Sequence, residues 1–466
     1  MPDPTSDNAL LSAWKATLSW RGSDPAILDP RGKILRTFFE IEIEALKVAR
    51  MVDRIPPGSA VGVQLGNGER WPEVLLALWR RRLVPMPLGD HLDNTALAIT
   101  LGTIRAAALV TNAGGTMFVH RRPVPPDAHL WGGPTPDLLK LTSGTTSAPR
   151  AIRFRAAQLV ADGDQICTGM GLAEHDVNYG VIPLAHSYGF SSLIVPLLTH
   201  GIPFVATRDH VPRAVLDGLA ATGATVFPGT PVFFQKLAAM DRLPKLPALR
   251  LCISAGAPLP KHDAGLFTAK FGHKIHVFYG SSECGGISYD ATGERLYEEG
   301  FVGTPLPGVE LEQEGEEAGP IVVRSAAVGD GYFPAADDAV LGGGSFVPGD
   351  LVRRTARGLY LAGRTSDIIN VAGRKLNPLE VEARLAECPG VRQAVVFGVP
   401  SALRGEEPVA CVAGEGLDEA GVLRFCQQTL SPWQTPRAVW LVDEIPATER
   451  GKINRRALAA SYLARK

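Results

Sequence analysis

The sequence has few cysteines and no CxxC pair. The six are Cys167, Cys252, Cys284, Cys388, Cys411 and Cys426. Scattered cysteines are typical of a reducing compartment and argue against a structural zinc site. The first 30 residues lack a basic start and an apolar core, so we do not expect secretion. The most apolar run, residues 193–205, is broken by a histidine and two prolines and is too short to span a bilayer. We therefore expect a cytoplasmic protein without a membrane span.

Charge of one sign is also lacking, because 47 lysines and arginines face 48 aspartates and glutamates, a formal net charge of -1. Nothing in this balance predicts nucleic acid or an anionic membrane as a partner. The chain has 466 residues, too many for one ordinary core, and 45% of them are hydrophobic. We therefore expect a soluble globular protein of roughly two to four structural units.

Apolar residues in the N-terminal part recur alternately at helical and at strand spacing. The predicted helices cover residues 34–52, 71–82 and 95–104, and the predicted strands cover residues 60–65, 84–88 and 107–111. This alternation predicts an α/β fold with a parallel sheet covered by helices. Residues 294–350 have dense glycines and short strands, which predicts a small β-rich unit. Residues 367–466 are expected to form a compact tail of strands and helices.

Residues 139–150 read LKLTSGTTSAPR and follow directly on a run of strand type, residues 138–141. The loop offers five hydroxyls, Gly144 lets the backbone approach a ligand closely, and Arg150 adds positive charge. These features are typical of a phosphate-binding loop. A solvated linker rich in serine and threonine is the alternative, although linkers seldom follow directly on an apolar strand. The absence of GxxxxGK[ST] disfavours a P-loop kinase.

A second motif, VFYGSSECGG, covers residues 277–286. A predicted strand delivers Tyr279, a glycine, two hydroxyls and the carboxylate of Glu283, groups that can stack on a purine, contact phosphate and hold a hard cation. Mg²⁺ needs few carboxylates, because it keeps water ligands and bridges substrate phosphates. A string this short also occurs by chance, so it predicts little when taken alone.

Weaker patterns also carry polar, aromatic or small groups. The strand over residues 249–254 ends in AGAP, and small residues let a flat ligand approach the backbone. His186 lies among prolines and aromatics, where a packed core histidine is the commoner finding. Phe233 begins a helix and is either a core aromatic or a wall of a substrate tunnel. Asp350 follows a Pro-Gly pair and either accepts bonds from a ribose diol or caps its own turn.

Two further motifs occupy the C-terminal quarter. Residues 361–382 read LAGRTSDIINVAGRKLNPLEVE. Arg364 offers a cation for ribose or phosphate, and the Asn-Pro pair predicts the start of an amphipathic helix over residues 379–385. Residues 444–458 read EIPATERGKINRRAL and place Lys452 on a glycine-containing turn. For an isolated lysine, a basic surface turn would be the ordinary interpretation.

The motifs LTSGTTSAPR, YGSSE, PGD, GRTSD and EIPATERGKINR occur in an order that resembles the adenylate-forming superfamily. This family includes acyl- and aryl-CoA synthetases, the adenylation domains of peptide synthetases, and luciferases, and the resemblance covers nearly the whole chain. It implies a large N-terminal domain, residues 1–365, made of doubly wound α/β subdomains and a small β-rich subdomain. It also implies a small, mobile α+β lid domain over residues 366–466.

The resemblance also implies roles in nucleotide chemistry. It implies catalytic roles for Lys452, Glu283 and Thr145, with Glu283 also holding the metal ion. The residues that it implies in binding ATP or AMP are Thr142, Ser143, Gly144, Thr146, Arg150, Gly256, Ala257, Pro258, Tyr279, Gly280, Ser281, Ser282, Asp350 and Arg364. This chain departs from the family at Ser147, where glycine is usual, and at Arg150, where lysine is commoner.

For the second substrate and the lid, the resemblance implies a smaller set of residues. His186, Tyr188 and Phe233 are implied in the acid pocket, and Gly373 in the channel for the thiol. Ser366 takes the position of the hinge, where the family usually has aspartate or lysine. The aromatic groups predict an apolar or aromatic acid, and no basic residue stands beside them in the sequence to favour a diacid.

The function that follows from the resemblance is an ATP-dependent ligase of a carboxylic acid and a thiol, acting through an acyl-adenylate. Mg²⁺, ATP and either CoA or a phosphopantetheine group are the implied cofactor and co-substrates. No carrier-protein domain follows Lys466, which favours a free-standing CoA ligase. The alternatives are an enzyme that loads a carrier protein, a degenerate relative that binds nucleotide without catalysis, and, more distantly, a nucleotide-dependent kinase.

Overall fold

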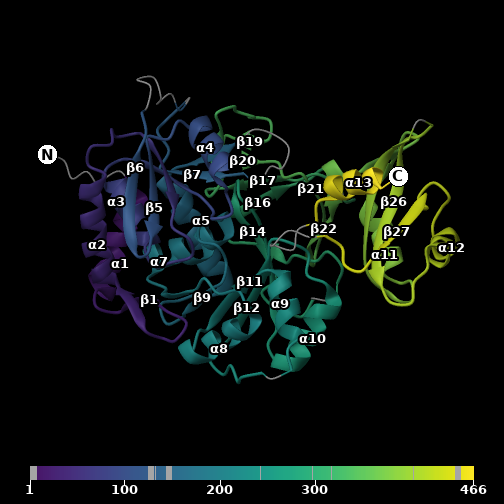
Figure 1. The fold of residues 1–466 in the computed structure, drawn as a ribbon, viewed down its shortest axis with the longest axis horizontal. Coiled ribbons are helices and arrows are strands. Elements are labelled where there is room, and N and C mark those ends of the chain that lie inside the picture. Colours follow the sequence, from purple (N-terminus) through teal and green to yellow (C-terminus); the bar gives the residue numbers. More distant parts are fainter. Residues whose placement is uncertain are drawn as a thin grey trace. The chain divides into compact units, whose positions relative to one another are not determined.

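The structure is a computed structural model that describes residues 8–123, 131, 133–142, 150–241, 243–295, 298–315, 317–401, 403–446 and 453–465. The chain folds into two compact units (Figure 1). The first comprises Met1–Glu312 and Val322–Pro348, and the second comprises Gln313–Ile321 and Gly349–Lys466. Within the described ranges, no helix combines the length and apolarity that a membrane-spanning segment needs. The predicted mobile domain from residue 366 stays a prediction.

A four-stranded sheet in the order β4-β3-β5-β6 lies in the N-terminal part of the first unit. Its strands are β3 (Ala60–Gln64), β4 (Val84–Pro87), β5 (Ala108–Ala113) and β6 (Thr116–Arg121). Strand β3 is parallel to β4 and β5, and helices α3 (Trp71–Arg80) and α4 (Asn94–Thr103) connect them. The three predicted strands are therefore parallel as expected, and the sheet gains an unpredicted edge strand, β6, which runs antiparallel to β5. The cause is a tight turn at Gly114 and Gly115, whose φ angles of 58° and 82° suit a hairpin.

Helix α2 (Phe38–Met51) begins four residues later than the apolar spacing predicts. The Thr37 hydroxyl accepts a bond from the Glu40 N–H at 3.2 Å, and the Glu40 carboxylate accepts one from the Thr37 N–H at 2.7 Å. This capping box fixes the start of the helix. The preceding residues form strand β2 (Ile34–Thr37), which pairs with β1 (Pro25–Leu28). The prediction of a helix from residue 34 is therefore wrong for its first four residues.

A nine-stranded sheet forms the centre of the first unit, in the order β15-β14-β13-β12-β11-β9-β10-β1-β2. Its remaining strands are β9 (Asn178–Gly180), β10 (Phe204–Ala206), β11 (Val226–Gly229), β12 (Leu251–Ala255), β13 (Ile275–Ser281), β14 (Gly285–Tyr289) and β15 (Thr304–Pro305). Strands β13, β12, β11, β9, β10 and β1 are parallel, and the strands at the two edges are antiparallel.

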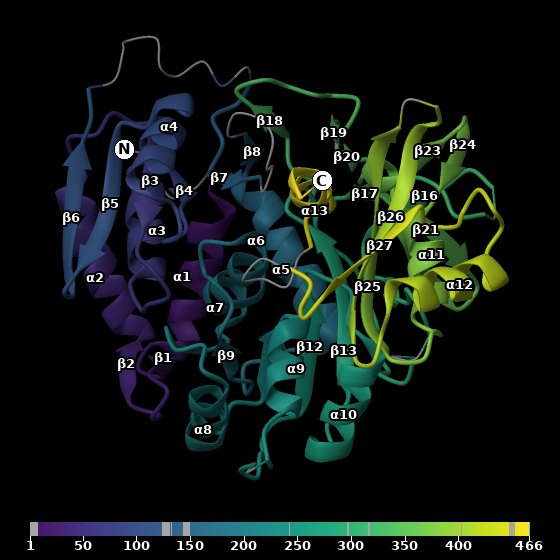
Figure 2. The same ribbon diagram turned by 45° about the vertical axis from the view of Figure 1, so that its right-hand side comes forward.

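Helices α8 (Pro212–Thr222), α9 (Pro231–Ala238) and α10 (Lys261–Phe271) pack on this central sheet, and Figure 2 shows α9 and α10 beside β12 and β13. Their core is built from aromatic rings, with Phe227, Phe234 and Phe267 fully buried in edge-to-face contact. The other helices of this unit include α1 (Ala9–Arg21), α5 (Ala156–Met170), α6 (Ser187–Gly189), the π-helix η1 (Phe190–Ile194) and α7 (Val195–His200).

The two strands on either side of the phosphate-loop motif pair with each other. Strand β7 (Leu138–Leu141) pairs antiparallel with β8 (Ala151–Phe154), which pairs with β18 (Gly331–Phe333). The expected short strands in the β-rich segment are present as β16 (Val309–Glu312), β17 (Val322–Ser325), β19 (Leu341–Gly342) and β20 (Ser345–Phe346), which form one antiparallel sheet.

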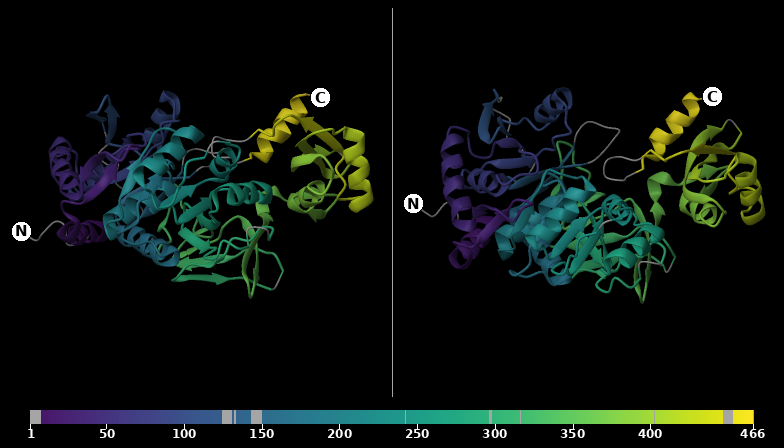
Figure 3. Two further views of the ribbon diagram at one scale, coloured as in Figure 1. Left: turned by 90° about the horizontal axis from the view of Figure 1, so that it is seen from below. Right: turned by 60° about the horizontal axis from the view of Figure 1, so that its bottom comes forward.

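The second unit is built on a hairpin and a five-stranded sheet, seen in yellow-green in Figure 3. The strands are β21 (Asp350–Thr355), β22 (Gly358–Arg364), β23 (Ile369–Val371), β24 (Arg374–Leu376), β25 (Val391–Ser401), β26 (Gly405–Gly414) and β27 (Ala438–Val442), with the 3-10 turn η2 (Thr365–Asp367). Helices α11 (Pro378–Leu385) and α12 (Glu419–Thr429) pack on one face of the five-stranded sheet, and α13 (Arg455–Ala464) packs on the other. Together, the two units confirm the predicted α/β fold with a smaller α+β unit.

Candidate active site

Four neighbouring parallel strands of the central sheet end at one edge, and each is followed by a predicted site segment. The segment of His186 follows β9, the helix that carries Phe233 follows β11, residues 256–258 follow β12, and Glu283 follows β13. Ligands of α/β sheets bind outside the carboxyl ends of the strands. The structure therefore brings the predicted acid segment and the predicted nucleotide segments to the same edge.

Glu283 is half-buried in the loop between β13 and β14. One carboxylate oxygen accepts a hydrogen bond from the Tyr332 hydroxyl at 3.2 Å, and the other accepts one from the Ser281 hydroxyl. Burial, reinforced by the negative charge of Glu283, raises the pKa of Tyr332, so this phenol stays a neutral donor. In the described part of the chain, no group of three metal-ligating side chains surrounds Glu283. A single carboxylate fits a Mg²⁺ ion whose other ligands are phosphate oxygens and water.

The two described ends of the phosphate loop are held together. The N–H and the hydroxyl of Thr142 donate to the carbonyl of Arg150 at 2.9 and 3.2 Å. The Arg150 guanidinium lies 3.8 Å from the centre of the Tyr332 ring, in a cation–π contact. Its buried Nε has no hydrogen-bond partner among the described residues, so a donor remains for an anion. Tyr332, which the sequence did not single out, therefore connects Arg150 to Glu283.

Four predicted loop residues, Ser143, Gly144, Thr145 and Thr146, lie outside the described residues, as does Lys452. Their assignments stay predictions.

A charged cluster that the sequence analysis missed is buried behind this edge, and its only sign in the sequence is the single lysine in LLKL at residues 138–141. Lys140 of β7 is 4% exposed, and its ammonium donates to the Ser191 hydroxyl at 3.3 Å. That hydroxyl donates to Asp162 of α5 at 2.5 Å, and the other carboxylate oxygen accepts from the Gly286 N–H at 3.0 Å. Burial lowers the pKa of Lys140, and Asp162 opposes this effect. The cluster joins the strand before the phosphate loop to the start of β14, directly after the loop that carries Glu283.

Backbone geometry explains the glycines in the predicted adenine segments. Gly256 is exposed and has a φ of +88°, a conformation that favours glycine. At Gly280 a Cβ atom would lie 2.6 Å from the Gly285 carbonyl oxygen, so a side chain does not fit there. Tyr279, beside it, is 8% exposed. The exposed Gly280 backbone is thus open to a flat ligand next to an aromatic ring.

The predicted acid pocket residues are half-buried and surround the end of the sheet. His186 caps the short helix α6, and its Nδ1 accepts from the Tyr188 N–H at 3.4 Å. The Tyr188 ring lies 5.9 Å from Phe278, and burial raises the pKa of its hydroxyl. The rings of Phe233 and Tyr188 both pack against the aromatic core of the central sheet.

A direct contact links the acid segment to the nucleotide segment. Ser187, next to His186, donates through its hydroxyl to the hydroxyl of Ser282 at 2.9 Å. Ser282 precedes Glu283 directly, so the two predicted subsites are neighbours and not merely parts of one sheet.

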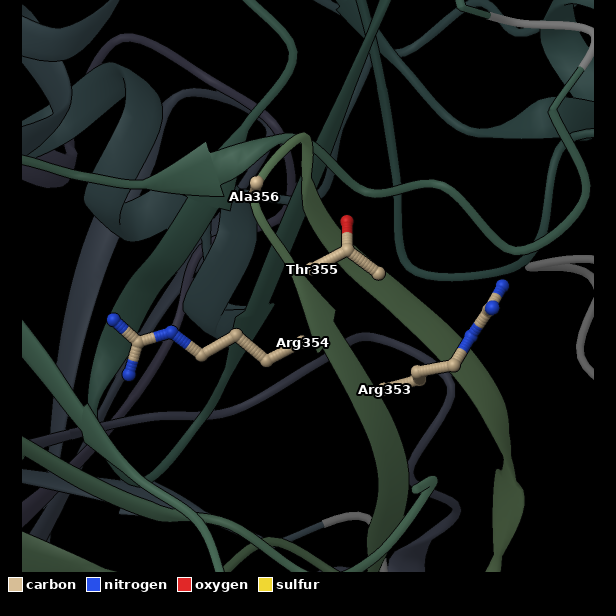
Figure 4. A pocket seen from close by; sticks show the side chains of 4 residues that line it. All are labelled: Arg353, Arg354, Thr355 and Ala356. Carbon is tan, nitrogen blue, oxygen red and sulfur yellow. The ribbon is translucent and has the colours of Figure 1, made fainter. Parts of the chain in front are cut away.

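In the second unit, the two predicted ribose contacts pair with each other. Asp350 and Arg364 face each other across β21 and β22, and the Arg364 Nε donates to the Asp350 carboxylate at 2.8 Å. A hollow of about 660 Å³ lies at the far end of this hairpin (Figure 4). Its lining residues are Arg353, Arg354, Thr355 and Ala356. None of these was a predicted site residue.

The predicted hinge adjoins a half-buried ion-pair cluster within the second unit. Ser366 lies in the turn η2, and its neighbour Asp367 lies 3.5 Å from the guanidinium of Arg455. Arg455 also pairs with Glu382 at 2.6 Å. Burial raises the pKa of Glu382 to about 7, and Arg455 opposes this shift. Gly373 is exposed and has a φ of +85° in the turn between β23 and β24.

Comparison with known proteins gives consistent matches along the chain. The AMP-binding enzyme family model matches residues 134–333, and the AMP-binding enzyme C-terminal domain model matches residues 380–452. A probable CoA ligase of Humulus lupulus is 31% identical over 461 residues, 87% of this chain and 87% of that protein. A 2-succinylbenzoate–CoA ligase of Geobacillus kaustophilus is 27% identical over 458 residues, 92% and 93% of the two chains.

Solved structures share the fold. ATP-bound MatB from Rhodopseudomonas palustris superposes with a TM-score of 0.84 at 24% identity, over 97% of this chain and 98% of that one. The o-succinylbenzoate CoA synthetase of Bacillus subtilis, in complex with its acyl-adenylate, has a TM-score of 0.80 at 21% identity, over 96% and 97% of the two chains.

Proposed function

Because the chain belongs to the AMP-binding enzyme family of adenylate-forming proteins, we propose that it activates an apolar or aromatic carboxylic acid as an acyl-adenylate and then transfers the acyl group to CoA. The chain is an ATP-dependent, AMP-forming ligase of the acyl-CoA synthetase type. We propose both the class of acid and CoA, instead of a carrier protein, as the acceptor.

The observation that carries this proposal is the common sheet edge, with the hydroxyls of Ser187 and Ser282 in contact across it. A carboxylate bound beside His186 and Tyr188 would lie next to a nucleotide bound along residues 256–258 and 279–283. Adenylation needs this adjacency, because the acid and the α-phosphate must react inside one site.

The chemistry explains why cationic groups surround such a site. In the first step a carboxylate oxygen attacks the α-phosphorus of ATP, and the bond to pyrophosphate breaks. Both reactants are anions, so positive groups must offset their repulsion. One well-aimed charge is worth roughly 3 kcal/mol, or about 100-fold in rate. In the second step the thiol sulfur attacks the acyl carbon, AMP leaves with the bridging oxygen, and the thiol proton passes to solvent.

The described residues fit parts of this task. Arg150 offers its Nε to a phosphate, and the Thr142 hydroxyl and N–H shape the loop end beside it. Glu283 would hold Mg²⁺, which supplies charge neutralisation at the phosphates when bound. Tyr332 orients Glu283 by a hydrogen bond and Arg150 by ring contact. Lys452 is assigned to the α-phosphate on its motif alone.

The acid class follows from the groups beside the pocket. Tyr188 and Phe233 are half-buried and present aromatic surface, which favours an apolar or aromatic acid. Relatives of this chain act on varied acids, among them a benzoate–CoA ligase of Thauera aromatica that is 28% identical over 404 residues. The relatives named as CoA ligases favour CoA over a carrier protein as the acceptor.

The experiment is a screen for pyrophosphate release from ATP and Mg²⁺ with a panel of aromatic, aliphatic and dicarboxylic acids, each with and without CoA. We expect release with one aromatic or apolar class, a thioester product when CoA is present, and at least about 100-fold slower release in Lys452→Ala. The exposed lysine variant Lys245→Ala serves as the matched control and should behave like the wild type.

Two results would contradict the proposal. ATP binding without pyrophosphate release for any acid would support a degenerate nucleotide-binding relative. Release that is not followed by thioester formation with CoA, but is followed by transfer to a phosphopantetheinylated carrier protein, would support the carrier-loading alternative.

A further inference from the structure

Helix α2 is apolar on two opposite sides. Its inner side packs into the first unit, and Phe38, Ile41, Ala45 and Val48 are at most 1% exposed. Its outer side carries Phe39 and Ile43, each 52% exposed, and Leu46, 48% exposed. A surface helix normally has one apolar stripe and a polar opposite face. A second stripe exposed to water indicates that another surface covers it in the assembled protein.

The outer stripe consists of Phe39, Ile43 and Leu46, at positions i, i+4 and i+7 of the helix, so the three side chains lie in one row. The row continues past the start of α2. A Cβ atom at Gly22 would lie 2.6 Å from the Phe39 ring, and Trp20, just before it, is 53% exposed.

Phe39, Ile43, Leu46 and Trp20, each about half exposed, together offer on the order of 400 Å² of apolar surface. This amount is about half of the roughly 800 Å² per partner that a stable interface buries, and the polar rim of such an interface supplies the remainder.

The charges around the stripe determine which partner fits. Glu40 and Glu44 lie in the N-terminal half of α2, and Lys47 and Arg50 lie in the C-terminal half. Lys47 pairs with Glu44 of its own helix at 2.5 Å, and Glu40 caps the helix, so the anion of Glu40 and the cation of Arg50 are the charges that distinguish the two ends. If a second α2 runs antiparallel across the stripe, the acidic half of each helix faces the basic half of the other. A two-fold interface requires this kind of self-complementary patch. An anionic membrane fits poorly, because interfacial helices carry an excess of lysine and arginine.

We propose that the outer stripe of α2 is the contact between two copies of this chain, related by a two-fold axis that passes beside Ile43. Figure 1 shows α2 at the edge of the first unit, with α3 behind its inner side. The carboxylate of Glu42 is engaged on that inner side, where it accepts from the Trp14 indole at 2.8 Å and pairs with Arg80 at 2.6 Å. The inner side is thus occupied, and the outer stripe remains for the second copy.

The first test is the mass of the full-length protein in solution, measured by sedimentation equilibrium over the micromolar range. We expect a dimer for the wild type and a dimer at least about 100-fold weaker for Ile43→Asp, which places two carboxylates at the axis. Leu403→Asp, at a residue 94% exposed in the second unit, is the matched control and should leave the dimer intact. Circular dichroism and pyrophosphate release confirm that each variant is folded.

The second test examines the two-fold geometry. All six cysteines are buried, so an engineered surface cysteine is the reactive one. Under mild oxidation, Ile43→Cys should form a disulfide with the second copy, because each residue on the axis faces itself. Arg50→Cys should not, because it faces the opposite end of the other helix.

A monomeric wild type would overturn the proposal. So would a dimer that Ile43→Asp leaves unchanged, or cross-linking by Arg50→Cys but not by Ile43→Cys. Binding of a monomer to phosphatidylglycerol vesicles that Ile43→Asp abolishes would instead assign the stripe to a membrane surface. Cross-linking to a different protein added in a mixed extract, with no homodimer, would also overturn it.

Discussion

Removing one charge from the buried cluster behind the sheet edge should cost more stability than removing both. Asp162→Asn leaves the ammonium of Lys140 buried without the Asp162 carboxylate, in contact with the Ser191 hydroxyl and with the rings of Phe154 and Phe190 at 4.7 and 5.7 Å. Lys140→Met leaves Asp162 as a buried anion that accepts bonds from Ser191 and Gly286. Breaking a buried charge pair by removing one member costs about 3–5 kcal/mol, whereas replacing both members with uncharged groups of similar size is often nearly neutral.

We therefore expect each single variant to have a free energy of unfolding about 3–5 kcal/mol lower than the wild type. The double variant Lys140→Met/Asp162→Asn should recover most of that loss. In calorimetry of the full-length protein, each single variant should lower the Tm of the first unit's unfolding transition by roughly 6–10 °C, because a domain of this size loses about 2 °C per kcal/mol. For Asp162→Asn the loss should shrink toward alkaline pH, because the buried Lys140 can release its proton.

The control is Lys236→Met, on the exposed surface of α9, which should change the free energy of unfolding by less than about 0.5 kcal/mol. Equal losses in the singles and an additive loss in the double variant would refute the reasoning, because they would mean that the two charges do not interact.

Three further outcomes follow from the site. Glu283→Gln should raise the Mg²⁺ concentration for half-maximal pyrophosphate release about tenfold or more. Glu310→Gln, at an exposed residue, should leave this concentration unchanged. The same Mg²⁺ concentration in both variants would contradict the metal assignment. Asp350→Ala should raise KM for ATP about tenfold, because losing a hydrogen bond to a charged group costs about 1.5–3 kcal/mol. An unchanged KM would show that Asp350 does not contact the ribose. Burial raises the folded-state pKa of Glu382 from 4.5 to about 7, so between these pH values the folded protein binds a proton that the unfolded chain has released. The free energy of unfolding therefore falls as pH rises from 4.5 through 7. Glu382→Gln should flatten this slope in thermal unfolding, and an equally steep slope in the variant would show that another group causes it.

The strands that build the site could be predicted from the sequence because their apolar runs are continuous. Strands β12 and β13 lie where the runs indicated, and the small or polar residues after them lie at the sheet edge. The resemblance to the adenylate-forming family is confirmed by the two family matches. The start of α2 was readable but missed, because the T-x-x-E pattern at Thr37 and Glu40 marks a capping box more precisely than apolar spacing does.

What the sequence could not reveal depends on contacts between distant segments. Lys140 stands alone among leucines in LLKL, which signals a buried charge, but its partners Asp162 and Ser191 follow 22 and 51 residues later. The order of strands β13, β12, β11 and β9, which places the acid segment beside Glu283, is likewise set by pairing and not by spacing. The role of Tyr332 depends on the pairing of β18 with β8.

The most direct test of adenylation follows the oxygen atoms of the acid. With an active acid labelled with ¹⁸O in its carboxylate, ATP and CoA, mass spectrometry of the AMP formed should find one ¹⁸O atom in each molecule, because the attacking carboxylate oxygen stays on the α-phosphorus when the thiol displaces AMP. Unlabelled AMP, or ADP with the label in inorganic phosphate, would contradict an acyl-adenylate and indicate that the acid is activated in another way.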